Sequence, residues 1–294
     1  MMEAATLRRL ADGRRLHLSH GPIDIILEAS GPAAAVAAAE AAAWTRFGTV
    51  LPELCGELGL LRTAADSLPG RPAGTVARRM VDAVLPHAPD TFITPMAAVA
   101  GAVAEEVLGA MTAAAPLRRA YVNNGGDIAL HLAPDEAFTL GIVDNPEAPR
   151  LAGSARIATT DAVRGVATSG WRGRSFSLGI ADAVTVLAAT ASAADAAATL
   201  IANAVDLPGH PAIARAPAAS RQPDSDLGER LVTVAVGALD ADEIDAALER
   251  GLARARRLVD AGHIAAAVLL LGGRSRAAGP MRLGLAPAAT AVVA

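Results

Sequence analysis

The N-terminal third of the chain has the pattern of strands followed by a long helical stretch. Residues 6–28 are predicted to form two strands around Asp12-Gly13, and apolar and polar residues alternate along the second. Residues 31–61 are rich in alanine, and leucines recur in them at helical spacing. Gly48 and Pro52 predict that this helix is interrupted rather than continuous.

A second apolar helix is expected to begin near Thr94. Threonine is a good N-cap, Pro95 suits the first helical position, and small residues such as Gly101 give the helix a flat face for close backbone packing. Its N-terminus, with N–H groups that lack helical partners, could seat an anion. A plain capped core helix is the alternative.

The remaining segments mix strands and helices without a regular βαβ period or an internal repeat. This favours an α+β fold with a mixed sheet over a doubly wound fold. We expect a single domain, 1–294, with an N-terminal portion of strands and helix over 1–90 and a core carrying the site motifs over 91–294. The other predicted elements are helices over 75–85, 192–203 and 241–259; strands over 138–143, 154–159, 165–168, 182–187 and 231–236; loops over 66–74, 171–179 and up to about 228; and glycine-punctuated strands from 263 onward.

Composition excludes several classes of function. All 26 basic residues are arginines, which rules out a Schiff-base lysine and a Walker P-loop. A net charge of −4 and 2% aromatic residues give no nucleic-acid footprint. Alanine, rather than a run of large apolar residues, causes the positive mean hydropathy, so no membrane span is expected. The N-terminus lacks the apolar core of a signal peptide, and a single cysteine gives no disulfide framework, so a cytoplasmic location is predicted. Cys55 is expected to fill the core and not to act as a nucleophile.

Two short apolar runs flank the segment Asn123-Asn124-Gly125-Gly126-Asp127. Asn-Gly between strand-like runs is a strong hairpin signal, because both residue types tolerate positive φ. Side-chain-free glycines also let backbone N–H groups approach a phosphate or carboxylate. The pattern alone favours the turn and leaves the binding site open.

Asp195 and Thr199 share one face of the predicted helix over 192–203. Their oxygens suit a hard cation such as Mg²⁺, with carbonyls, water or substrate phosphates completing the coordination. Ser192 and Asp195 also have the spacing of a capping box, so a purely structural cap is the alternative. Arg172 and Arg174 could clamp a phosphate or simply be solvated. The six histidines are scattered along the sequence and do not indicate a metal site.

The motifs in order resemble the ApbE-type flavin transferases. Asn124-Gly125-Gly126-Asp127 resembles their N-x-G-G-D segment, and it is followed in the same order by Ala167-Thr168-Ser169-Gly170, Val184-Thr185-Val186 and Ala194-Asp195-Ala196-x-Ala198-Thr199. The chain is most similar to a shorter branch of that superfamily, uncharacterised protein family 0280. Its hallmark runs resemble Thr94–Gly101 and Ser175–Val186 here, and the likeness extends from about residue 20 to 270.

The resemblance implies a fold, a cofactor and a set of site residues. The fold would be ApbE-like, with a largely antiparallel mixed sheet packed with helices. ApbE-type enzymes hydrolyse FAD or transfer its FMN half to a protein threonine with the help of Mg²⁺. By resemblance, Asp195, Thr199 and the Ala167 carbonyl would hold the metal. FAD or another phosphorylated cofactor would be bound by Asn124, Gly125, Gly126, Asp127, Thr168, Ser169, Gly170, Ser175 and Ser177.

One departure from the family pattern bears on activity. Flavin transferases carry a histidine, an Asp-Pro and a Thr-Gly just before the Val-Thr-Val strand, whereas residues 171–183 contain neither histidine nor proline. Asp182 is the only carboxylate in this gap and is our candidate base. The expected function is therefore metal-dependent binding, hydrolysis or transfer of a phosphate-bearing cofactor. A non-catalytic binding or assembly protein and an enzyme of pterin or one-carbon cofactor metabolism are the alternatives.

The expected partner is a small-molecule cofactor or substrate. Binding to nucleic acid or to a membrane is not expected. A homo-oligomer is compatible with the sequence.

Overall fold

The computed structural model describes residues 4–143, 151–280 and 283–285. The chain divides into two compact units whose segments alternate along the sequence. Unit 1 consists of Met1–Ala137, Ala158–Ala167 and Ala189–Ala196; unit 2 consists of Phe138–Ile157, Thr168–Ala188 and Ala197–Ala294. Residue 90, where the sequence suggests a division, lies inside unit 1.

The strands of unit 1 pair in antiparallel fashion in the order β1-β2-β3-β4-β5, and the first residues of β8 continue this order beside β5. Their bounds are β1 Thr6–Arg9, β2 Leu16–His20, β3 Ile23–Ser30, β4 Arg119–Asn124, β5 Asp127–Leu132 and β8 Gly165–Ser169. Residues 6–28 thus belong to three strands, and the prediction of two was wrong. A turn at Gly21, whose φ is 56°, separates β2 from β3.

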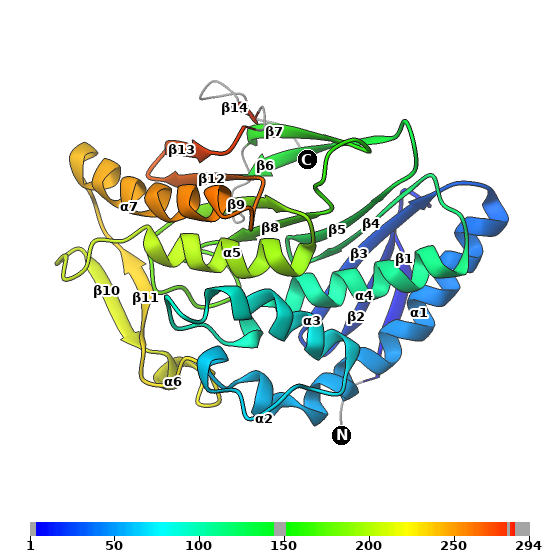
Figure 1. Ribbon diagram of the computed structural model, residues 1–294, viewed down its shortest axis with the longest axis horizontal. Coiled ribbons are helices and arrows are strands. Elements are labelled where there is room, and N and C mark those ends of the chain that lie inside the picture. Colours follow the sequence, from blue (N-terminus) through cyan, green and yellow to red (C-terminus); the bar gives the residue numbers. More distant parts are fainter. Residues whose placement is uncertain (1–3, 144–150, 281–282, 286–294) are drawn as a thin grey trace. The chain divides into compact units, whose positions relative to one another are not determined.

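Helices of unit 1 lie on one side of its strands (Figure 1). They are α1 Ala33–Gly56, α2 Leu58–Leu61, α3 Thr75–Val84 and α4 Val99–Ala114, with short 3₁₀ turns at η1 Ala65–Ser67, η2 Leu85–His87 and η3 Pro95–Ala98. Helix α1 passes through Gly48 and Pro52, so the predicted interruption was wrong. A proline ring crowds the carbonyl four residues earlier in a helix, which here is that of Gly48. Phe47 and Val50 before the proline and Leu54 after it are buried, and their burial keeps the helix in the core on both sides of Pro52.

The start of α4 differs in detail from the expected cap. Pro95 does occupy the first position of η3, but Thr94 makes no side-chain cap hydrogen bond. The segment Pro95–Ala114 is, among the described residues, the one helical stretch long and apolar enough to cross a membrane by length and composition. In unit 1 it packs against α1 and strands β4 and β5.

The core of unit 1 lies between these helices and strands. It includes Leu18, Ile25 and Leu27 from the sheet and Phe47 and Met111 from the helices, all fully buried. Fully burying one such side chain contributes roughly 1.5–3 kcal/mol, so the helix layer is held by apolar contact. Cys55 is exposed, and the expectation that it fills the core was wrong.

Unit 2 is built around antiparallel strands β9, β12 and β13, over which α7 lies (Figure 1). A three-stranded sheet in the order β14-β7-β6 and a hairpin of β10 and β11 complete its strands. The bounds are β6 Ala137–Val143, β7 Leu151–Ala158, β9 Ala183–Ala188, β10 Ile213–Pro217, α6 Ala218–Arg221, β11 Leu231–Val236, α7 Ala241–Asp260, β12 Ala266–Leu271, β13 Arg274–Ala278 and β14 Leu283–Leu285. The α+β fold class is confirmed, but the loop predicted before residue 228 contains β10 and α6.

Candidate functional site

The glycine segment forms a tight hairpin between β4 and β5. Asn124 pairs with Asp127 across a loop of Gly125 and Gly126, whose φ angles are 66° and 113°. Positive φ at both loop residues is the geometry that glycine permits at little cost, so the turn interpretation is confirmed. The Asn123 Oδ1 atom accepts a hydrogen bond from the Gly126 N–H at 2.8 Å, which fixes the loop from within.

The hairpin is tied to the first turn of α4. The Asn124 side chain is buried and donates from Nδ2 to the Ala100 carbonyl at 3.1 Å. One residue further along α4, the Gly101 N–H donates to Asp195 Oδ2 at 3.0 Å. Two motifs that are far apart in the sequence therefore converge, within unit 1, on one helical turn.

Asp195 lies on α5 (Ala191–Ala204), but it does not cap its own helix. Thr190 does so, since its Oγ1 accepts from the Ala193 N–H at 3.2 Å. The predicted capping box of Ser192 and Asp195 was wrong, because both side chains are turned toward α4 instead. The anion seat expected at the start of α4 receives a carboxylate from the protein itself.

Close backbone contact brings these elements together. A Cβ atom at Gly101 would overlap the backbone of Ala191, and one at Gly165 would overlap the backbone of Thr190. Only glycine at these two positions lets α4 and β8 approach the start of α5 so closely. Ala167, the predicted carbonyl ligand, is fully buried two residues beyond Gly165.

Burial raises the pKa of Asp195 to about 7, although the Gly101 and Ala100 N–H groups act in the opposite direction. Between about pH 4 and pH 7 the folded protein therefore holds a proton that the unfolded chain releases, so stability decreases as the pH rises through this interval. We expect the free energy of unfolding to fall by up to about 4 kcal/mol. Urea unfolding across this range measures it.

The matched variants for this pH effect are Asp195→Asn and Asp90→Asn. Asparagine at 195 can still accept from Gly101 but does not titrate, so its unfolding free energy should change less with pH than that of the wild type. Asp90 is exposed, and its variant should behave as the wild type does. Equal pH dependence in the wild type and Asp195→Asn would contradict the assignment.

In unit 2, the Asp182 carboxylate is held by two donors. Arg172 Nε donates to Oδ1 at 2.9 Å, and the Gly272 N–H donates to Oδ2 at 2.8 Å. The Arg172 guanidinium also lies 4.4 Å from the centre of the Trp171 ring. Of the two interpretations left open for Arg172, a phosphate clamp or a solvated side chain, neither describes this ion-paired and stacked state.

The serine and threonine candidates of unit 2 differ in their surroundings. Ser177 is buried; its Oγ donates to Asn203 Oδ1 at 3.2 Å and accepts from the Gly179 N–H at 3.2 Å. Thr168 and Thr185 share a hydrogen bond of 2.9 Å between their hydroxyl groups. Ser175 is exposed, Ser169 is partly buried and Gly170 is buried.

The predicted metal ligands are divided between the units along the chain. Ala167 and Asp195 belong to unit 1, whereas Thr199, one helical turn beyond Asp195, belongs to unit 2. Within the described ranges, no three histidine, cysteine, aspartate or glutamate side chains gather into a metal site. In their chemistry the predicted ligands are a carboxylate, a carbonyl and a hydroxyl, which are the hard oxygen donors that Mg²⁺ takes.

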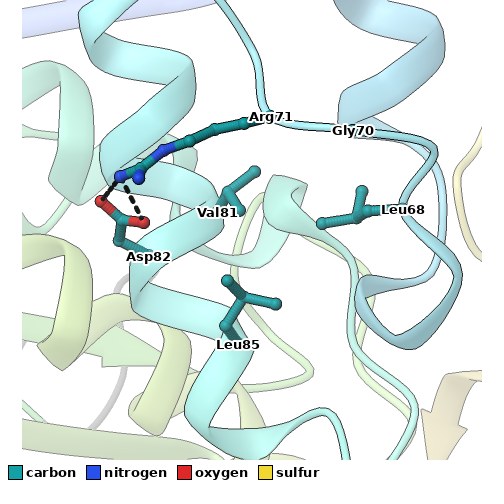
Figure 2. A pocket seen from close by; sticks show the side chains of 6 residues that line it. All are labelled: Leu68, Gly70, Arg71, Val81, Asp82 and Leu85. Atoms are coloured by element: carbon teal, nitrogen blue, oxygen red, sulfur yellow. Dashed lines mark hydrogen bonds and ion pairs between the residues drawn. The ribbon is translucent and has the colours of Figure 1, made fainter.

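A hollow on unit 1 is separate from these residues. It has a volume of about 230 Å³, is lined by apolar side chains such as Leu68 and Leu85, and has the ion pair of Arg71 and Asp82 on one side (Figure 2). None of the predicted site residues lines it.

Sequence reasoning missed Glu105. Its carboxylate on α4 accepts from the Ser192 N–H and hydroxyl at the start of α5. The available signal was a pair of glutamates, Glu105 and Glu106, inside an otherwise apolar helix.

Comparison with known proteins gives archaeal relatives named UPF0280 protein. The one from Methanothrix thermoacetophila is 39% identical over 140 residues, which cover 47% of this chain and 55% of the relative. The one from Methanococcoides burtonii is 38% identical over 125 residues, covering 42% and 51%. The chain thus matches about half the length of these curated relatives.

The chain is also similar to solved structures and to a protein family. The match to the apo crystal structure of Pseudomonas stutzeri flavinyl transferase ApbE covers 95% of this chain and 94% of the transferase chain, with 13% identity and a TM-score of 0.42. A flavin transferase ApbE from Vibrio cholerae covers 94% and 97%, with 13% identity and a TM-score of 0.35. The family described as AbpE bacteria matches residues 7–277. The chain belongs to this family, and the ApbE-like membership expected from its motifs is confirmed.

Proposed function

We propose that the protein binds a phosphate-bearing cofactor of the flavin class together with a divalent metal, and hydrolyses or transfers part of it. The observation that carries the proposal is the convergence of Asn124 and Asp195 on the Ala100-Gly101 turn of α4. The glycine hairpin and the candidate metal carboxylate are thereby fixed to one helix N-terminus, which favours negative groups. Membership of an ApbE-like family supports the flavin class.

The donor chemistry of the chain fits magnesium. Asp195 supplies a carboxylate whose pKa burial has raised to about 7, and a bound cation would favour its charged form. The Ala167 carbonyl and the Thr199 hydroxyl would be the other protein ligands. When bound, the metal would neutralise phosphate charge at the reacting group.

Asp182 is proposed as the proton acceptor. The Gly272 N–H can remain bonded to Oδ2 while Oδ1 separates from Arg172 and accepts a proton from the attacking group. Arg172, once released, carries a guanidinium that can pair with a phosphate oxygen.

Binding and turnover of FAD test the proposal. The purified protein is titrated with FAD with and without Mg²⁺, flavin fluorescence is followed, and the products are separated. Mg²⁺-dependent binding with appearance of FMN and AMP is the expected result. FMN and a pterin are titrated in the same way. Absence of binding to FAD and FMN would contradict the flavin class, and binding of the pterin would favour the alternative cofactor.

A second candidate is a protein that binds the cofactor without reacting it. Two observations favour it. Both Asp182 oxygens are already bonded to Arg172 and Gly272, and residues 171–183 contain no histidine. Binding of intact FAD with no product would select this candidate.

Asp182→Asn separates catalysis from binding. We expect FAD turnover to fall roughly 100-fold or more, since general base catalysis contributes about 10²–10⁴-fold, while the dissociation constant changes little. Steady-state rates and fluorescence titration measure the two quantities. Asp206→Asn, which alters another arginine-paired carboxylate of unit 2, is the control. Unchanged turnover in Asp182→Asn would remove the residue from the reaction.

A further inference from the structure

Glu105 closes the first turn of α5 from the neighbouring helix. Its Oε1 accepts from the Ser192 N–H at 2.6 Å and from the Ser192 hydroxyl at 2.8 Å. The other carboxylate oxygen faces Arg79 at 3.4 Å. Ser192 is buried, so Glu105 provides the acceptor for an N–H group that has no partner within its own helix.

Asp195 makes the reverse contact from α5 to α4. Its Oδ2 accepts from the Gly101 N–H, one turn before Glu105 on the same helix. Each helix start therefore receives a carboxylate from the other helix. The Gly101–Ala191 backbone contact, which allows no Cβ atom, leaves little room for either helix to shift without breaking both bonds.

We propose that Glu105 is a positioning residue that holds the first turn of α5 so that Asp195 stays on the start of α4. The inference deepens the proposed function and rests on it where ligand binding is concerned. Asp195 lies one turn into the segment that Glu105 anchors. Loss of the anchor frees the Ser192 amide and lets the first turn of α5 fray, which displaces the Asp195 carboxylate. Glu106, the next residue, shares Arg79 with Glu105, but its other contacts are Arg46 and Thr75 and not the start of α5.

Three variants test the role. Glu105→Ala removes the acceptor, Glu105→Gln keeps an acceptor oxygen without the charge, and Glu106→Gln changes the adjacent carboxylate. The first readout is amide hydrogen exchange by NMR at Ser192 and Gly101, and the second is the affinity for FAD with Mg²⁺, measured where thermal unfolding shows each variant to be folded.

We expect Glu105→Ala to speed exchange at both amides about tenfold or more and to weaken Mg²⁺-dependent FAD binding about tenfold. In Glu105→Gln, the amide exchange rates and the FAD affinity should stay close to those of the wild type, because an acceptor oxygen is kept. In Glu106→Gln, the exchange rate at Gly101 and the affinity should also stay near the wild-type values. If Glu105→Ala does not fold, Ser192→Ala, which removes one of the two bonds, is measured in its place and should show smaller changes in the same direction.

Unchanged exchange at Gly101 together with faster exchange at Ser192 would overturn the proposal, because Glu105 would then be a cap and nothing more. Equal losses in Glu105→Ala and Glu106→Gln would also overturn it. Failure of the wild type to bind FAD and Mg²⁺ would count against the proposed function alone, since exchange at Gly101 reports the placement of Asp195 without any ligand.

Discussion

Gly101→Ala is expected to lower the free energy of unfolding by about 3 kcal/mol. The added Cβ atom would meet the Ala191 carbonyl and lie 2.7 Å from the Ser192 nitrogen, and these backbone atoms cannot move aside as a side chain tip can. Relief requires α4 and α5 to separate, which breaks the contacts of Asp195 and Glu105 as well. Urea unfolding of the purified variant measures the loss.

Gly109→Ala is the matched control for this effect. Gly109 lies in the same helix, and a Cβ atom there meets nothing within 4 Å. Alanine has the higher helix propensity, so this variant should be about 1 kcal/mol more stable than the wild type at most. Comparable destabilisation by both substitutions would show that helix propensity, and not the crossing at Gly101, sets the cost.

Asp195→Asn is expected to weaken Mg²⁺-dependent FAD binding roughly 100-fold or more. Loss of the charge removes the one carboxylate among the proposed magnesium ligands, and metal–carboxylate contacts depend on that charge. The asparagine oxygen can still accept from Gly101, so the fold should persist. Fluorescence titration at saturating Mg²⁺ measures the affinity.

Asp90→Asn is the control for charge, and thermal unfolding is the control for folding. If Asp195→Asn binds FAD as the wild type does, with the same Mg²⁺ dependence, Asp195 is a structural carboxylate only. The magnesium site would then have to be sought elsewhere in the chain.

Local patterns predicted much of the fold. The Gly125-Gly126 turn, the buried strand β9 and helix α7 follow directly from alternation, turn chemistry and helical spacing. The failures have local causes. A single glycine turn at Gly21 split one expected strand, and apolar burial carried α1 across Pro52.

The site was harder to predict, because its contacts join residues far apart in the sequence. The spacing of Ser192 and Asp195 is that of a self-capping helix, yet both side chains serve α4. Nothing in the spacing of Glu105 indicates that it would reach α5. The family resemblance implied that Asp195 is a metal ligand, but it did not predict the contact between α4 and α5 that holds its side chain.

Division of the chain into units was also beyond local pattern. Strand β8 and helix α5 each start in unit 1 and end in unit 2, so these two boundaries fall inside regular elements and not in loops. The alternation of the two units along the sequence depends on which distant segments pair with one another. The spacing of hydrophobic residues does not determine that pairing.

The most direct test of the proposed site is an NMR titration of ¹⁵N-labelled protein with FAD, with and without Mg²⁺. We expect the Gly101, Gly125 and Gly126 amide signals to shift together, and the shifts at a given FAD concentration to be much larger with Mg²⁺ present. Shifts confined to amides outside the hairpin and the first turn of α4, or the same shifts without Mg²⁺, would contradict a metal-dependent cofactor site at this turn.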